Sequence, residues 1–146
     1  LQWKSQMAWI KVDDQPGRKV DLTGLFAMMQ AETFGGGYRV APGMQPFGDS
    51  ASIVLGFGLT KLQMLSVMGP LEKGRHVGKW GKISMEPCRR FEIKALDSEG
   101  NPTDEKGHEP PLFISLDGEI SMTTPVSFEF HEGQLNVRGG KRPPNV

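Results

Sequence analysis

Two carboxylates flanking a glycine are the residues of this chain best suited to chemistry. Asp117, Gly118 and Glu119 follow the apolar run 112–116 and precede a further strand-like run. Carboxylates this close could share a hard cation such as Mg²⁺, or could hold a hydroxyl group for proton removal. An Asp-Gly pair is also a common signal for a two-residue hairpin turn. Spacing leaves both interpretations open and favours the turn.

Two glycine-containing segments are weaker candidates. The backbone of Gly35–Gly37 could approach a phosphate closely, but the segment lacks the strand, helix and lysine of a phosphate-binding loop. A tight bend between strands is the favoured interpretation. His76 in Gly74-Arg75-His76 could make a polar contact at a site, although a lone histidine is more often structural. Arg89 and Arg90 are most simply solvated charges, with an anionic membrane or a phosphate as the alternative partner.

The cysteine and histidine residues argue against a disulfide, a nucleophilic thiol and a zinc site. Cys88 is the single cysteine, so no internal disulfide can form, and a buried structural thiol is expected rather than a nucleophile. This usage fits a reducing compartment. The three histidines lack the spacing of a zinc site.

Length and charge set the class of protein. The 146 residues fit one compact domain, expected over 1–138 with a tail at 139–146. With 17 basic and 17 acidic residues the chain has no basic excess, which argues against a general nucleic-acid binder. No apolar run reaches the length needed to span a bilayer.

The elements that must position these residues are mostly short strands. Apolar residues alternate with polar ones at 91–95 and at 126–130. A strand is expected at 7–12, centred on Trp9 and Ile10, and a buried strand at 51–57, where Ile53, Val54, Leu55 and Phe57 are apolar. Many alternating strands bury their apolar faces most simply by packing sheet on sheet. The pattern predicts a mainly β fold, namely a two-layer antiparallel β-sandwich with one short helix.

That helix is expected from Thr60 to Met68. Thr60 and Gln63 have the spacing of a capping box, and Gly69-Pro70 is expected to end the helix. An apolar stripe is expected to pack in the core, or alternatively to line an apolar ligand cavity. It consists of Leu62, Leu65 and Met68, with Met64 beside them.

The order of these segments resembles the C-terminal domain of the diacylglycerol kinase, sphingosine kinase and ceramide kinase superfamily. That family has a Gly-Gly-Gly-aromatic-x-hydrophobic-Ala-Pro element, a buried strand with a short helix, a Gly-x-His turn, an Asp-Gly-Glu followed by a Pro, and a closing Gly-x-Leu-x-Val. The corresponding segments here are Gly35–Pro42, Ile53–Phe57 with Thr60–Met68, Gly74–His76, Asp117–Glu119 with Pro125, and Gly133–Val137. The match runs from about Leu22 to Val137.

The resemblance implies the lipid-acceptor half of an ATP- and Mg²⁺-dependent lipid kinase that phosphorylates a hydroxyl of a diacylglycerol or sphingoid base. The family's Gly-Gly-Asp-Gly nucleotide loop belongs to an N-terminal domain and does not occur in this chain. The chain is therefore expected to be inactive by itself. Asp117 and Glu119 take the family's catalytic and Mg²⁺-nucleotide roles, with Gly118 between them in the nucleotide-facing segment.

The resemblance also implies partners and a location. The partners are a lipid substrate, the nucleotide domain of the same protein and a peripheral membrane surface, in the cytoplasm and without nucleic acid.

One departure from the family pattern concerns an acidic region that holds a structural metal in some members of that family. The usual Asp-Gly order is reversed at Gly48-Asp49, and Ser52 replaces a frequent second acid. A non-catalytic lipid-binding or interaction module is the alternative function.

Overall fold

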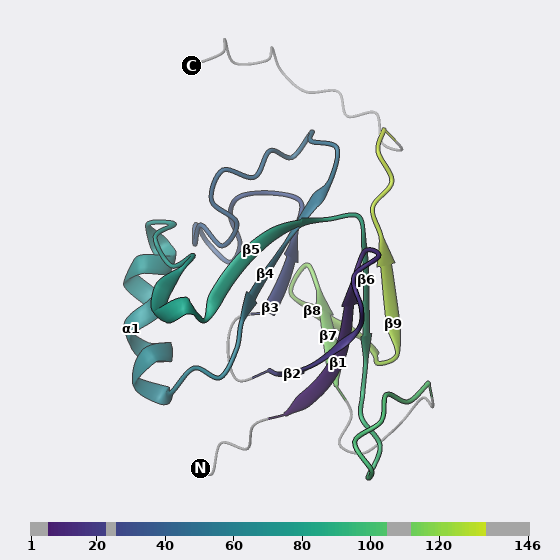
Figure 1. Cartoon of the computed structure of the whole chain (residues 1–146). Coiled ribbons are helices and arrows are strands. Elements are labelled where there is room, and N and C mark those ends of the chain that lie inside the picture. Colours follow the sequence, from purple (N-terminus) through teal and green to yellow (C-terminus); the bar gives the residue numbers. More distant parts are fainter. Residues whose placement is uncertain (1–5, 23–25, 105–111, 134–146) are drawn as a thin grey trace.

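The computed structural model describes residues 6–22, 26–104 and 112–133 (Figure 1). Within these ranges the chain forms nine strands, one α-helix and one short 3₁₀ helix. The strands are β1 (Met7–Val12), β2 (Arg18–Asp21), β3 (Phe26–Met29), β4 (Ala51–Gly56), β5 (Ile83–Cys88), β6 (Arg90–Lys94), β7 (Phe113–Leu116), β8 (Glu119–Thr123) and β9 (Val126–Glu129). The helices are α1 (Lys61–Glu72) and the 3₁₀ helix η1 (Lys79–Gly81).

The strands form three antiparallel sheets, in the orders β2-β1-β6-β9, β3-β4-β5 and β7-β8. Only Arg89 separates β5 from β6, so one nearly continuous length of chain passes from the three-stranded to the four-stranded sheet (Figure 1). The expected mainly β fold with one main helix is confirmed. The expected two-layer sandwich is not confirmed, because the described strands form three sheets and β7 and β8 pair only with each other.

Burial of β4 shows how the core is built. All six of its residues are buried, as in a strand that is covered on both faces. Ile53 and Leu55 belong to a core cluster shared with β1 and β6. Val54 belongs to a second cluster, which includes Val67 and Leu71 of α1. The three-stranded sheet therefore contributes to a core with the four-stranded sheet on one face and is covered by α1 on the other (Figure 1).

The alternation expected at 91–95 is confirmed in β6. Phe91 and Ile93 are buried, while the residues between them are more exposed. The ring of Phe91 lies 5.3 Å from the ring of Phe26 on β3, measured between centroids. Aromatic pairs at this distance add to the stabilisation from burial, so this contact ties the two larger sheets together.

Helix α1 begins as expected but ends later. The side chain of Thr60 accepts from the Gln63 N–H, and the Gln63 side chain accepts from the Thr60 N–H, which completes the capping box. The expected end at Gly69-Pro70 is wrong, because the helix continues through Pro70 to Glu72, although proline removes one helical N–H donor there. Gly74 ends the helix instead, with the Arg75 N–H donating to Pro70 and the Gly74 N–H donating to Leu71, a Schellman motif.

The expected core stripe of α1 is also wrong. Leu62, Leu65 and Met68 are 78%, 74% and 45% exposed. The residues that pack against the sheet are Val67 and Leu71, with Met64 partly buried beside them. The helix therefore carries two apolar ridges, of which one is in the core and one faces outward.

Candidate functional site

Asp117 and Gly118 form the two-residue turn between β7 and β8. Both have left-handed backbone conformations, with φ of 48° and 94°, which is the geometry that joins two twisted strands most readily. Aspartate tolerates this conformation better than most residues and glycine adopts it freely, so the local sequence selects the turn. The hairpin-turn interpretation of Asp-Gly is confirmed, and Glu119 begins the return strand opposite Leu116.

The hairpin places both carboxylates in solvent. Asp117 and Glu119 are exposed, and neither has a hydrogen-bond or ion-pair partner among the residues that the structure describes. Three apolar side chains on the same hairpin are exposed as well, namely Phe113, Leu116 and Ile120. The hairpin therefore combines carboxylates without described partners at its tip with exposed apolar side chains on its strands, which is a combination that suits an amphipathic ligand.

Asp117 and Glu119 do not form a metal site by themselves. In the described part of the chain no group of three or more His, Cys, Asp or Glu side chains is arranged to hold a metal ion. Mg²⁺ takes six oxygen ligands and commonly draws only one or two of them from carboxylates. The two residues are of the right chemistry to contribute part of such a set, and their metal role stays a prediction.

Two motifs that are distant in the sequence meet beside α1. The triglycine loop is closed by paired hydrogen bonds between Phe34 and Tyr38, and all three of its glycines have positive φ, which confirms the tight bend. After it, the Val40 carbonyl lies 3.0 Å from Nε2 of His76. A Cβ added to Gly74 would lie 3.1 Å from that of Pro42, so the helix end packs closely on this loop.

His76 is buried as a structural residue. Its Nε2 donates to Val40, while its Nδ1 is buried without a hydrogen-bond partner among the described residues. Burial lowers the pKa of His76 below its usual value, more than the hydrogen bond to Val40 raises it. The fold therefore holds the neutral imidazole.

This burial predicts a stability loss in mild acid. The unfolded chain takes up a proton on His76 near pH 6.5, whereas the folded chain does so only at lower pH. The contribution of His76 to the free energy of unfolding is therefore fully present above about pH 6.5 and is lost as the pH falls. The free energy of unfolding in urea should be lower at about pH 5.5 than at about pH 7.5. His131→Gln, at an exposed histidine, should keep this difference, whereas His76→Gln should remove most of it. Equal free energies of unfolding at the two pH values in the wild type would contradict the expected effect of burying His76.

The loop after the triglycine bend is held by Glu32. Its Oε1 accepts from Arg39 at 2.6 Å and from the Gly43 N–H at 2.8 Å, and these two bonds lower the pKa of the carboxyl. Farther along, the hydroxyl of Ser52 is buried and donates to Sδ of Met44. Ser52, which stands where the resemblance to lipid kinases implies a frequent acid, therefore serves packing here. Among the described residues no group of three or more potential metal ligands lies in this region.

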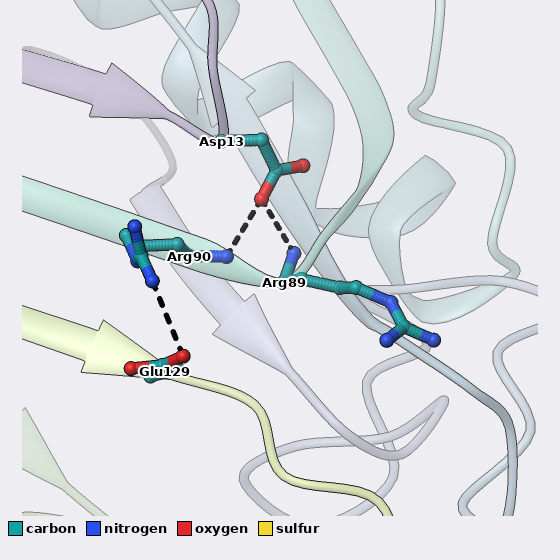
Figure 2. Close-up of polar contacts among 4 residues, drawn as sticks. All are labelled: Asp13, Arg89, Arg90 and Glu129. Carbon is teal, nitrogen blue, oxygen red and sulfur yellow. Dashed lines mark hydrogen bonds and ion pairs between the residues drawn. The ribbon is translucent and has the colours of Figure 1, made fainter.

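Sequence reasoning missed Asp13, which organises the junction of the two larger sheets. Its Oδ1 accepts from the backbone N–H groups of Arg89 and Arg90, at 2.8 and 2.6 Å (Figure 2). Its own N–H donates to the Arg90 carbonyl. These bonds satisfy the backbone where the chain leaves β5 and enters β6. The sequence signal was a polar turn, which gave no indication of partners about 76 residues away.

The arginines at this junction differ from each other. The guanidinium of Arg90 pairs with Glu129 of β9 at 3.3 Å, whereas that of Arg89 points away from Asp13 (Figure 2). Cys88 beside them is buried, and burial raises the pKa of its thiol to about 11, with Asp13 and Glu86 adding to the effect. The thiol stays protonated at neutral pH, as expected of a structural cysteine.

A pocket of about 420 Å³ lies away from both carboxylates. It is formed by Gln6 and Met7 at the start of β1, by residues 95–100, which follow β6, and by Leu112. No residue of α1 lines it, so it is not the apolar cavity that the helix stripe was expected to line. Among the described helices, none combines the length and the apolar character needed to cross a bilayer.

Comparison with known proteins assigns no family, since no protein-family model matches the chain and a search of the curated proteins found no similar sequence. The resemblance to lipid kinases therefore rests on the motifs and their order.

Proposed function

We propose that this chain is the lipid-acceptor domain of an ATP- and Mg²⁺-dependent lipid kinase. The observation that carries the proposal is the series of motifs in the family's order, which ends in Asp117-Gly118-Glu119. The surroundings of that triplet support it. Two carboxylates without described partners lie at the tip of a hairpin that also exposes apolar side chains.

Phosphoryl transfer depends mainly on positioning and on electrostatic stabilisation. The nucleotide and Mg²⁺, bound by a separate domain, supply the phosphoryl group and offset its developing charge. In this chain, Glu119 or Asp117 would accept a hydrogen bond from the lipid hydroxyl and take its proton as the hydroxyl oxygen bonds to the γ-phosphorus of ATP. The bond from that phosphorus to the β–γ bridging oxygen would break at the same time and release ADP. The exposed apolar residues of the hairpin would hold the adjacent part of the lipid.

A non-catalytic lipid-binding module is the second candidate. The reversed Gly48-Asp49 pair and the buried Ser52 favour it, because the acidic region of active relatives is altered there. The intact Asp117-Gly118-Glu119 favours the kinase, because a binding module has no need for paired carboxylates at an exposed tip.

A lipid phosphorylation assay with two forms of the protein tests the proposal. The isolated chain, incubated with ATP, Mg²⁺ and diacylglycerol or sphingosine, should give no phosphorylated lipid above a blank without protein, because it has no nucleotide loop. The same chain joined to the nucleotide domain should give product. Turnover by the isolated chain would place nucleotide binding within these residues and contradict the proposal. A joined protein that binds lipid without phosphorylating it would establish the module instead.

A further inference from the structure

The outward ridge of α1 and an exposed aromatic residue of η1 lie on neighbouring elements. Leu62, Leu65 and Met68 are spaced three residues apart and lie along one line of the helix surface. Trp80 of η1 is 44% exposed. Lys82, which follows η1, donates to the Gly58 carbonyl at 2.7 Å and to Gln63 of α1 at 3.2 Å. These bonds fix η1 beside the first turn of α1, and Figure 1 shows both at the same edge of the molecule.

The same segment concentrates positive charge. Residues 61–82 contain five basic residues and one acidic residue, in a chain whose totals are equal. The basic residues are Lys61, Lys73, Arg75, Lys79 and Lys82. Each of the four ion pairs within the described ranges involves other cations. Positive charge here is therefore not neutralised within the described fold.

We propose that this α1–η1 face, meaning the exposed side chains of residues 61–82, docks the chain on an anionic membrane surface. Leucine, methionine and tryptophan side chains enter the boundary between head groups and acyl chains, while lysines on the same helix reach anionic head groups. The proposal rests on the proposed function in one respect, because a domain that accepts a lipid must reach the bilayer that contains it.

Charge favours a membrane over a second copy of the chain. A symmetric dimer through this face would bring two copies of the same basic patch together. Such a contact would add repulsion between cations that have no described acidic partner. An anionic bilayer instead supplies both the negative charge and the apolar phase that the exposed residues lack.

Sedimentation with vesicles tests the surface without ATP or a reaction. The chain should bind phosphatidylcholine vesicles that contain about a third phosphatidylserine, and should bind pure phosphatidylcholine at least about tenfold more weakly. The double variant Leu62→Gln/Leu65→Gln should lose about tenfold or more in binding, as should Lys61→Gln/Lys73→Gln. Raising the salt concentration should weaken the binding of the wild-type chain to the anionic vesicles.

Matched control variants remove exposed apolar residues or cations outside the α1–η1 face. Phe34 and Phe47 are 54% and 87% exposed, so Phe34→Gln/Phe47→Gln removes comparable apolar surface elsewhere. Arg18→Gln/Arg90→Gln removes two cations that are already paired. Both control variants should bind as the wild type does. Circular dichroism and unfolding in urea check that every variant is folded.

Four results would overturn the docking surface: no binding to anionic vesicles, equal binding to neutral ones, equal losses in the control variants, or a concentration-dependent dimer that Leu62→Gln/Leu65→Gln abolishes in sedimentation velocity. The last of these would establish self-association through the face. A protein that docks through α1 but phosphorylates no lipid would leave this inference standing and remove the proposed function. Phosphorylation of lipid in micelles by a protein whose domain does not bind vesicles would support the proposed function and remove the docking surface.

Discussion

If the proposed function holds, replacing Glu119 by Gln in this chain joined to its nucleotide domain should lower lipid phosphorylation by about a hundredfold. The substitution keeps the size of the side chain and removes the charge that would orient the lipid hydroxyl and receive its proton. Loss of a charged contact made in the transition state raises the barrier by roughly 3 kcal/mol, which corresponds to this factor. The fall should appear in kcat, measured with saturating lipid and ATP.

Stability and a matched glutamate complete this test. Glu119 is exposed and has no described partner, so Glu119→Gln should change the free energy of unfolding by no more than about half a kcal/mol. Glu132→Gln, at another exposed glutamate that neighbours a turn glycine, should leave kcat unchanged. Gly118→Ala should destabilise the chain under any account, since Gly118 has φ of 94°. Wild-type turnover in Glu119→Gln would reduce the triplet to an ordinary turn.

Replacing Asp13 by Gly should destabilise the fold by about 1–3 kcal/mol, because it leaves two backbone N–H groups without their acceptor. Glycine adopts the left-handed conformation that Asp13 has here, so this variant isolates the lost hydrogen bonds. Asp13→Ala should cost roughly 1 kcal/mol more, since alanine is strained at φ of 48°. Chemical unfolding of the purified chain measures both changes.

Two further variants bracket the role of Asp13. Asp13→Asn keeps an oxygen acceptor and tolerates the same backbone, so it should lose about 1 kcal/mol or less. Asp14→Ala, at the exposed neighbouring aspartate, should change stability by no more than about half a kcal/mol. If Asp13→Gly were as stable as the wild type, the junction between β5 and β6 would not depend on the carboxylate.

Features determined by neighbouring residues were predictable from the sequence. The strand at 7–12 was predicted with the bounds that β1 has, and the capping box of α1 follows from two residues three positions apart. The Asp-Gly turn is likewise a local choice of backbone conformation. The β6 alternation could be predicted because a strand with one buried face repeats every two residues.

Features that depend on tertiary packing could not be predicted from the sequence. Helix α1 has two apolar ridges, Leu62-Leu65-Met68 and Met64-Val67-Leu71, and the sequence does not say which one meets the sheet. The role of Asp13 depends on partners far along the chain. For the candidate site, the sequence indicated the turn and the exposed carboxylates. It gave no sign that β7 and β8 form a sheet of their own.

The most direct test of the proposed function joins this chain to its nucleotide domain and supplies labelled ATP with a panel of diacylglycerol and sphingoid-base lipids. Mass spectrometry of the extracted lipids locates the transferred phosphate. We expect phosphate on a lipid hydroxyl, with the yield falling about a hundredfold in Glu119→Gln and remaining unchanged in Glu132→Gln. Consumption of ATP without any phosphorylated lipid, or equal yields from the two variants, would contradict the proposed function.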